Sequence, residues 1–221
     1  MSKAVITRLI VLGMMLFIMS ACKQVDDQPK EGIYPWQITL QADGKTRVFG
    51  ITLGESTLNF ARDLWGRDYN LGLFETSNQP LSLEAYFNEV TLGGISGKFI
   101  LILDATQDEL LALQQNAIKR KVLGSGAKQY TLTAETTNVL AQKRIESLSY
   151  IPYVNLDEEI IRKRFGEPAE RIIIDQKRQH LLFPELGLDL LLDEEGKEFL
   201  QYVVPAKFEQ LRQPLLEKYN R

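Results

Sequence analysis

The sequence predicts an α+β fold made of two units, each a short helix followed by an antiparallel sheet, after an N-terminal export segment. Three observations lead to this fold class: an apolar run near the N-terminus, a similarity between two segments 100 residues apart, and short apolar stretches between turn residues after each segment. The chain has 221 residues, enough for one large or two small domains. We expect four parts: a signal peptide (1–21), a tether (22–32), a first α+β unit (33–142) and a second α+β unit (143–221).

The N-terminal segment has the order of an export signal. Residues 9–19, LIVLGMMLFIM, are apolar; Lys3 and Arg8 precede them, and Ser20 and Ala21 follow. A basic region, an apolar run and small residues are typical of a secretory signal peptide. The eleven apolar residues span about 16 Å as a helix, whereas a bilayer core needs about 20 such residues. The pattern therefore favours a cleaved signal peptide over a membrane-spanning helix.

The end of this segment, Met19-Ser20-Ala21-Cys22, resembles the bacterial lipobox, which usually begins with Leu, Val or Ile where this chain has Met19. The resemblance implies a diacylglycerol on the Cys22 thiol, cleavage just before Cys22, and acylation of the new amine, for example with palmitate. Cys22 is the only cysteine, so lipidation leaves no free thiol in the exported body. Two or three acyl chains meet or exceed the two signals that stable anchoring needs. The alternative is an ordinary signal peptide with a cysteine by chance.

The residue after the cysteine and the net charge indicate compartment and partners. In lipoproteins of Gram-negative bacteria an Asp directly after the cysteine favours inner-membrane retention; because Lys23 stands here, the resemblance implies the outer membrane, facing the periplasm. Removing residues 1–21, with two basic and no acidic residues, takes the formal charge from −3 to −5. This acidity and the compartment exclude nucleic acid as a partner. We expect contact with the membrane, through acyl chains on Cys22, and with an envelope protein.

After the cysteine the chain begins with polar residues and a hairpin. Residues 23–32, KQVDDQPKEG, are polar and contain a proline and a glycine, so we expect a flexible tether. Residues 34–51 are a hairpin candidate, with Asp43-Gly44 at the turn.

Two segments 100 residues apart are similar. Residues 51–68 align with residues 151–168, and each matched pair keeps one physical role. Thr57 and Asp157 are N-cap residue types, and Gly66 and Gly166 are typical of a helix end. The sequence therefore predicts one short helix in each copy, with chance similarity of two amphipathic helices as the alternative. The matched pairs are Ile51 and Ile151, Thr57 and Asp157, Phe60 and Ile160, Ala61 and Ile161, Arg62 and Arg162, Trp65 and Phe165, and Gly66 and Gly166.

The charges of the second copy suit a helix. Its acidic residues, 157–159, lie at the positive N-terminal end, and its basic residues, 162–164, lie at the negative C-terminal end. We interpret the carboxylates as complements of the helix dipole rather than as a catalytic acid and base. Pro168 supports a helix end before it.

Strands follow each helix in a meander, because turn residues and short spacings demand antiparallel pairing. The short helix is expected to cover one face of each sheet. The expected strands are 71–75, 81–87 and 97–104 after the first helix, and 171–175, 180–183, 186–192 and 198–204 after the second.

The rest of the chain predicts additional elements. Thr106 and Glu109 form a capping box before a helix expected from about Gln107 to Val122. A strand at 128–132, a short helix after residue 133 and a strand at 144–151 follow. Apolar residues from position 206 onward recur at helical spacing, and Pro214 is expected to break this tail into two pieces.

The second copy resembles the SmpA/OmlA lipoproteins, which include the BamE subunit of the outer-membrane β-barrel assembly machine. Their repeat runs Gly, Thr at +2, an apolar residue at +6, Leu at +10, Gly at +11 and Pro at +13. The resemblance covers about 18 residues in each copy and implies a helix-plus-antiparallel-sheet fold like that of the β-lactamase inhibitor protein. It carries over no partner-binding residue. The second copy offers Asn155, Asp157, Ile161, Phe165, Gly166 and Pro168; the first offers Gly54, Ser56, Phe60 and Leu64, with Gly66 one residue late and Asp68 at the proline position.

Catalytic and metal-binding patterns are weak. His180 is the only histidine, and we expect it at a strand edge in contact with solvent rather than in a catalytic triad. The Asp193–Gly196 segment suits a hairpin turn better than a calcium loop. Neither Gly93-Gly94 nor the glycines at 124 and 126 fit a phosphate loop. We predict no catalytic, cofactor or metal site; the open alternative, a peptidoglycan hydrolase, has only scattered carboxylate candidates, Glu75, Glu84, Asp104 and Asp189.

Binding is the favoured function. Aromatic residues and arginine are common interface anchors, and Trp36, Trp65, Arg67 and Tyr69 lie near the first helix and its hairpin. These four are candidate protein-contact residues; the alternative is that the Trp rings belong to the core. We predict a non-enzymatic interaction or envelope-assembly accessory protein. A carrier of a lipid or other apolar ligand remains the alternative, and it requires a cavity between sheet and helix.

Overall fold

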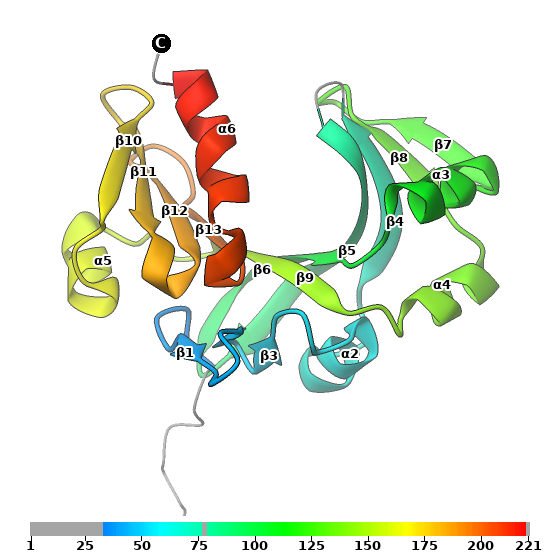
Figure 1. The fold of residues 1–221 in the computed structure, drawn as a ribbon, viewed down its shortest axis with the longest axis horizontal. Coiled ribbons are helices and arrows are strands. Elements are labelled where there is room, and N and C mark those ends of the chain that lie inside the picture. Colours follow the sequence, from blue (N-terminus) through cyan, green and yellow to red (C-terminus); the bar gives the residue numbers. More distant parts are fainter. Residues whose placement is uncertain (1–32, 77–78, 220–221) are drawn as a thin grey trace, which may run out of the picture. The chain divides into compact units, whose positions relative to one another are not determined.

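Ten strands from both halves of the chain form one antiparallel sheet (Figure 1). The computed structural model describes residues 33–76 and 79–219. Within them the order is β10-β11-β12-β13-β9-β6-β5-β4-β8-β7, and a separate sheet has the order β1-β2-β3. Five α-helices, α2 to α6, complete the described part, so the expected α+β class is confirmed. The expected signal peptide, Cys22 and the tether lie outside the described residues.

The small sheet contains the expected hairpin. β1 (Thr39–Leu40) pairs antiparallel with β2 (Thr46–Val48), which pairs with β3 (Ile51–Thr52). Gly44 lies at the turn with φ +80°, a conformation that glycine adopts without strain. Between β2 and β3, the Phe49 side chain turns into the core and is 2% exposed.

The two similar segments form matching helices, as the pattern predicts. α2 (Leu58–Trp65) and α5 (Glu158–Phe165) each have eight residues. Thr57 caps α2 by accepting a hydrogen bond from Phe60 N, and Asp157 caps α5 by accepting one from Ile160 N. Gly66 and Gly166 end the two helices with positive φ. The shared spacing of cap and glycine thus fixes helix length in both copies.

An antiparallel meander follows each helix, and β9 joins the two meanders. β9 (Ile145–Pro152) pairs with β6 on one side and β13 on the other. The sheet therefore continues across the expected boundary between residues 142 and 143, and the division into two units stays a prediction. The first meander is β4 (Asn70–Thr76), β5 (Gln79–Leu92) and β6 (Ile95–Leu103); the second is β10 (Glu170–Ile173), β11 (Arg178–Phe183), β12 (Leu188–Asp193) and β13 (Phe199–Tyr202).

The helix expected to reach Val122 is shorter than predicted. α3 (Gln107–Gln115) has the expected capping box but ends at Gln115, with Asn116 as its C-cap, and β7 (Lys119–Val122) follows as an exposed edge strand. Its pairing with β8 (Lys128–Thr131) replaces the last helical turns. The prediction was wrong because apolar spacing alone did not separate a helix end from an edge strand. α4 (Ala134–Leu140), capped by Thr133, is as expected.

The C-terminal tail is one helix, not two. A 3₁₀ turn, η2 (Pro205–Lys207), precedes α6 (Glu209–Tyr219), and Pro214 lies inside α6. The expected break at Pro214 is therefore wrong. One apolar face packs on the sheet along the length of the helix, which offsets the hydrogen bond that proline cannot donate. That face contains Leu211, Leu215, Leu216 and Tyr219.

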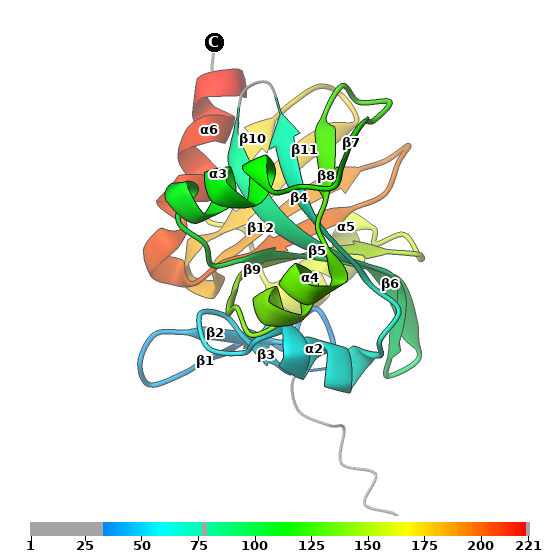
Figure 2. The same ribbon diagram turned by 90° about the vertical axis from the view of Figure 1, so that its right-hand side faces the viewer.

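Helices cover opposite faces of the second meander. In Figure 1, α5 (yellow) and α6 (red) lie on either side of β10 to β13. Leu182 belongs to the cluster under α6, whereas its neighbours Leu181 and Phe183 belong to the main core that also contains Ile161 of α5. This alternation follows from the two-residue period of a strand. Figure 2 shows α2 and the small sheet side by side below the large sheet. Both contribute buried residues to the main core, among them Ile51 and Leu58.

Candidate binding site

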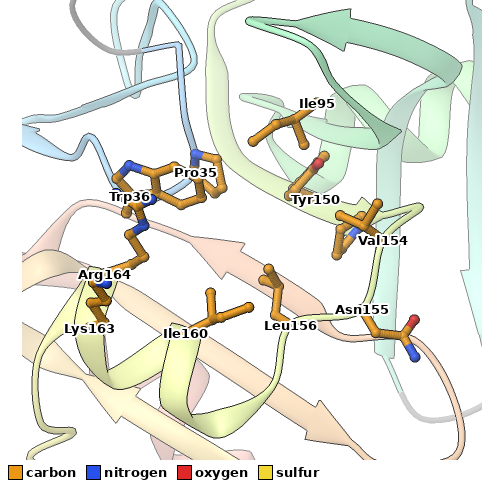
Figure 3. Close-up of a pocket in the computed structure, with 11 residues that line it drawn as sticks. Pro35, Trp36, Ile95, Tyr150, Val154, Asn155, Leu156, Ile160, Lys163 and Arg164 are labelled. Atoms are coloured by element: carbon orange, nitrogen blue, oxygen red, sulfur yellow. The ribbon is translucent and has the colours of Figure 1, made fainter.

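A cavity of about 420 Å³ opens between the N-terminal described segment, β9 and α5 (Figure 3). Figure 3 shows three walls: Pro35 and Trp36, then Ile95 and Tyr150, then Leu156 and Ile160. Lys163 and Arg164 of α5 lie at the Trp36 end. We call this cavity the Trp36 pocket. Its walls are mostly apolar, and its volume is in the range of small-ligand and side-chain pockets.

A local turn, a stacked tyrosine ring and a cation–π contact hold Trp36 in place. Gln37 Oε1 accepts hydrogen bonds from the backbone N of Ile33 (3.2 Å) and Tyr34 (3.1 Å), which fixes the turn before Trp36. The Tyr34 ring stacks on the Trp36 ring with centroids 5.1 Å apart. The Arg164 guanidinium lies over the Trp36 ring, 4.5 Å from its centroid, in a cation–π contact. The indole therefore contacts two planar groups, the Tyr34 ring and the Arg164 guanidinium.

The helix α5 presents a second wall because of its phase. Ile161 is 1% exposed and packs in the core, so Ile160 must turn away from it and is 39% exposed. Lys163 and Arg164 follow Ile160 by three and four residues and therefore share its face. Helical periodicity thus places one apolar and two cationic side chains beside Trp36.

The loop between β9 and α5 closes the other end. Tyr153 N donates to Ser96 O at 3.0 Å, and Lys197 Nζ donates to Tyr153 O at 2.8 Å. Leu156 is buried, whereas Tyr153 and Val154 are 40% and 58% exposed. The loop is thus tied down on its inner side and presents an apolar outer edge next to the pocket.

The Tyr150 side chain forms part of the pocket wall and is uncharged at neutral pH. Burial raises the pKa of its phenol to about 12. The hydroxyl donates to Ser96 O at 3.2 Å. The charges at this site therefore come from Lys163 and Arg164, which suit an apolar group carrying a negative charge or an acceptor at one end.

The sequence-predicted contact residues lie in different environments. Trp36 lines the pocket. Trp65 and Tyr69 instead pack around Phe87, with ring centroids 5.4 Å and 5.3 Å away, and Trp65 Nε1 donates to Phe49 O. This is the core role named as the alternative for the Trp rings. Arg67 is exposed in the turn after α2.

The scattered carboxylate candidates have separate local partners. Glu75 binds Lys128 Nζ at 2.6 Å and accepts from the Tyr130 hydroxyl, and these contacts lower its pKa. The other three are bound as follows: Glu84 by the Ser82 and Tyr86 hydroxyls, Asp104 by Arg144, and Asp189 by His180. In the described part of the chain these bonds tie each candidate to its own neighbours.

The expectation that His180 contacts solvent was wrong. His180 is 8% exposed, and its Nδ1 lies 2.9 Å from Asp189 Oδ1. The Tyr219 ring of α6 lies against it, with centroids 5.9 Å apart. The prediction missed this because the tail was expected to be broken at Pro214, whereas the continuous α6 covers this face of the sheet. His180 is therefore part of a buried polar pair.

Comparison with known proteins finds no matching family model, no similar curated protein and no similar solved structure. Among the residues that the structure describes, no helix combines the length and apolar character needed to cross a bilayer.

Proposed function

We propose that this protein is a lipoprotein anchored through Cys22 in the outer membrane, facing the periplasm, and that it binds an envelope protein through the Trp36 pocket. The observation that carries the proposal is the pocket itself, with apolar walls, a cation-stacked indole and an apolar rim in one place. Protein interfaces are built around such buried aromatic and arginine anchors with a polar surround.

The rim extends the pocket into a surface. Val154 and Ile160 are exposed apolar side chains that line it. A contiguous apolar area rimmed by charged residues marks contact sites on soluble domains. We infer that a partner inserts an apolar side chain between Trp36 and Ile160 and covers Val154 with its neighbouring residues.

The proposed anchor is close to this surface in the chain. Ile33, the first described residue, follows Cys22 by eleven residues, and Pro35 and Trp36 follow Ile33 by two and three residues. The lipobox resemblance supports the anchor, and Lys23 supports the outer membrane. The two matching helix-and-meander segments support a SmpA/OmlA-like, two-unit architecture and, with it, an accessory role in envelope assembly.

A carrier of a small apolar ligand is the second candidate function. A cavity of about 420 Å³ with mostly apolar walls favours it. Pockets of this size hold one drug-sized molecule rather than a whole two-chain phospholipid. Mass spectrometry of an organic extract separates the candidates: a stoichiometric small molecule released from the purified protein favours the carrier.

Replacing Trp36 by Ala should remove the partner. We expect a pull-down of the acylated chain from detergent-solubilised membranes to recover at least about ten-fold less of the associated protein, because a buried aromatic anchor contributes about 2 kcal/mol or more to an interface, equivalent to roughly thirty-fold in affinity. The measurement is quantitative mass spectrometry of the recovered proteins, and the mass of the chain itself reports acylation of Cys22.

The matched control is Phe60→Ala. Phe60 is 46% exposed on α2 and lies outside the pocket, so the partner should be recovered as with the unmodified chain. Equal recovery with Trp36→Ala and Phe60→Ala would contradict the proposal.

A further inference from the structure

A second cavity, of about 270 Å³, adjoins the loop that closes the Trp36 pocket. The two cavities share Asn155 and Leu156 as lining residues. We call the second cavity the acidic pocket, because the described residues that line it include five carboxylates and no basic side chain. The carboxylates are Asp157, Glu158, Asp193, Glu194 and Glu198.

Glu198 is the unusual member of this group. It is 2% exposed, and among the described residues its Oε2 has no hydrogen-bond partner. Burying a carboxylate without a partner is among the most costly arrangements in a folded protein. Glu198 lines the acidic pocket, so its unpartnered buried acceptor marks a position at the pocket wall where a donor is missing.

The charged side chains near Glu198 form ion pairs or hydrogen bonds with other groups. Glu158 pairs with Arg171 at 2.9 Å and with Arg162 at 3.2 Å. Lys197 directs its ammonium to Tyr153 O and to Asn155 Oδ1. The positive end of α5 is already complemented by its own acidic first turn. Within the described ranges, Glu198 therefore has no basic side chain at ion-pair distance.

We propose that the acidic pocket receives a lysine or arginine side chain of the same envelope protein that fills the Trp36 pocket, with Glu198 as its buried counter-ion. This proposal rests on the proposed function. Charge complementarity supports it, since a cationic head brings the donors that Glu198 lacks. The shared Asn155 and Leu156 allow one partner segment to enter both cavities.

A basic side chain fits this cavity better than a metal ion does. Ca²⁺ requires several oxygen ligands at about 2.3–2.6 Å. Within the ranges that the structure covers, no group of three or more His, Cys, Asp or Glu residues is arranged to hold a metal ion. The cavity volume suits a longer organic cation whose stem lies against Leu156 and Leu192.

The test is a titration of the isotope-labelled acylated chain in detergent micelles, followed by NMR. The probes are n-butylammonium chloride and n-propylguanidinium chloride, which mimic the two side chains, with sodium chloride at matched ionic strength. We expect saturable shifts of the amides of residues 193–198 with dissociation constants on the order of millimolar. Glu198→Gln should weaken this binding about ten-fold.

The matched control is Glu195→Gln. Glu195 lies in the same turn, but its carboxylate pairs with Lys177 and does not line the acidic pocket, so its replacement should leave the binding unchanged. Glu198→Gln should not lower the midpoint of thermal unfolding, since it removes an unpaired buried charge. Asp193→Asn is a second variant from the rim and should also weaken binding of the probes.

Two results would overturn the proposal. One is equal binding of butylammonium by Glu198→Gln and the unmodified chain. The other is a response of the same amides to micromolar CaCl₂ without a response to the organic cations, because the pocket would then hold a metal. The titration needs no partner, so this failure is distinct from failure of the proposed function, which appears as a partner that is retained by Trp36→Ala.

Discussion

Replacing Gly187 by Ala is expected to lower the free energy of unfolding by about 3–4 kcal/mol. Gly187 has φ +65° between a 3₁₀ turn and β12, and a Cβ there would lie 2.0 Å from Val203 O. Its own carbonyl accepts from Val203 N at 2.8 Å, so the two backbones are already in contact. The added methyl group would separate β12 from the segment that leads into α6. Urea unfolding of the detergent-solubilised full chain, followed by circular dichroism, measures the loss.

Gly126→Ala is the matched control for Gly187→Ala. Gly126 also has positive φ, +84°, but a Cβ there would have no atom within 4 Å. The free energy of unfolding of this variant should therefore fall by only about 1 kcal/mol, the cost of placing alanine at positive φ. Equal losses in the two variants would show that the close approach of Gly187 to Val203 does not exist.

Replacing Phe49 by Ala is expected to cost about 4 kcal/mol, within the range for a buried aromatic ring. The Phe49 ring connects the small sheet to the large one, because its centroid lies 4.8 Å from that of Phe99 and 4.9 Å from that of Tyr150. Phe49 also has φ +52°, and alanine keeps that backbone strain without the packing. Urea unfolding of the full chain measures this loss in the free energy of unfolding.

The Phe49→Ala variant should also loosen the Trp36 pocket, since Tyr150 is both a neighbour of Phe49 and a pocket wall. Phe49→Leu keeps most of the apolar volume and should cost about 1–2 kcal/mol. A loss below about 1 kcal/mol in Phe49→Ala would mean that the small sheet is not packed on the large one as described.

Local signals predicted most of the fold. Thr57 and Gly66, and Asp157 and Gly166, defined the bounds of α2 and α5 because caps and helix-ending glycines act within one turn. The turn residues likewise predicted antiparallel meanders. Sequence did not predict that β9 would pair with both β6 and β13, because that pairing depends on contacts between distant segments.

The errors in the fold have one common cause. The residues before Val122 were assigned to a helix by their apolar spacing, and the break at Pro214 was predicted from the helix-breaking character of proline, but tertiary contacts decided both cases. Pairing with β8 made residues 119–122 a strand, and packing on the sheet kept α6 continuous through Pro214. Local propensity is a weak signal where such contacts compete with it.

The candidate site was predicted only in part. Trp36 was named, but its partner Arg164 was interpreted only as a complement of the helix dipole. The phase of α5 carried a usable signal, because a buried Ile161 requires Ile160, Lys163 and Arg164 to face elsewhere. The approach of α5 to Trp36 and the burial of Glu198 depend on the fold and could not be predicted from spacing.

The most direct test of the central claim, that the Trp36 pocket binds an envelope protein, is photo-crosslinking in living cells from a photoreactive amino acid at position 154. Val154 is 58% exposed at the pocket rim, and Val139, 68% exposed on α4, is the matched control position. We expect position 154 to give one discrete crosslinked protein, and we expect Trp36→Ala to reduce its yield. Position 139 should not crosslink to that protein. The same crosslinked protein from both positions, or none from position 154, would contradict the account.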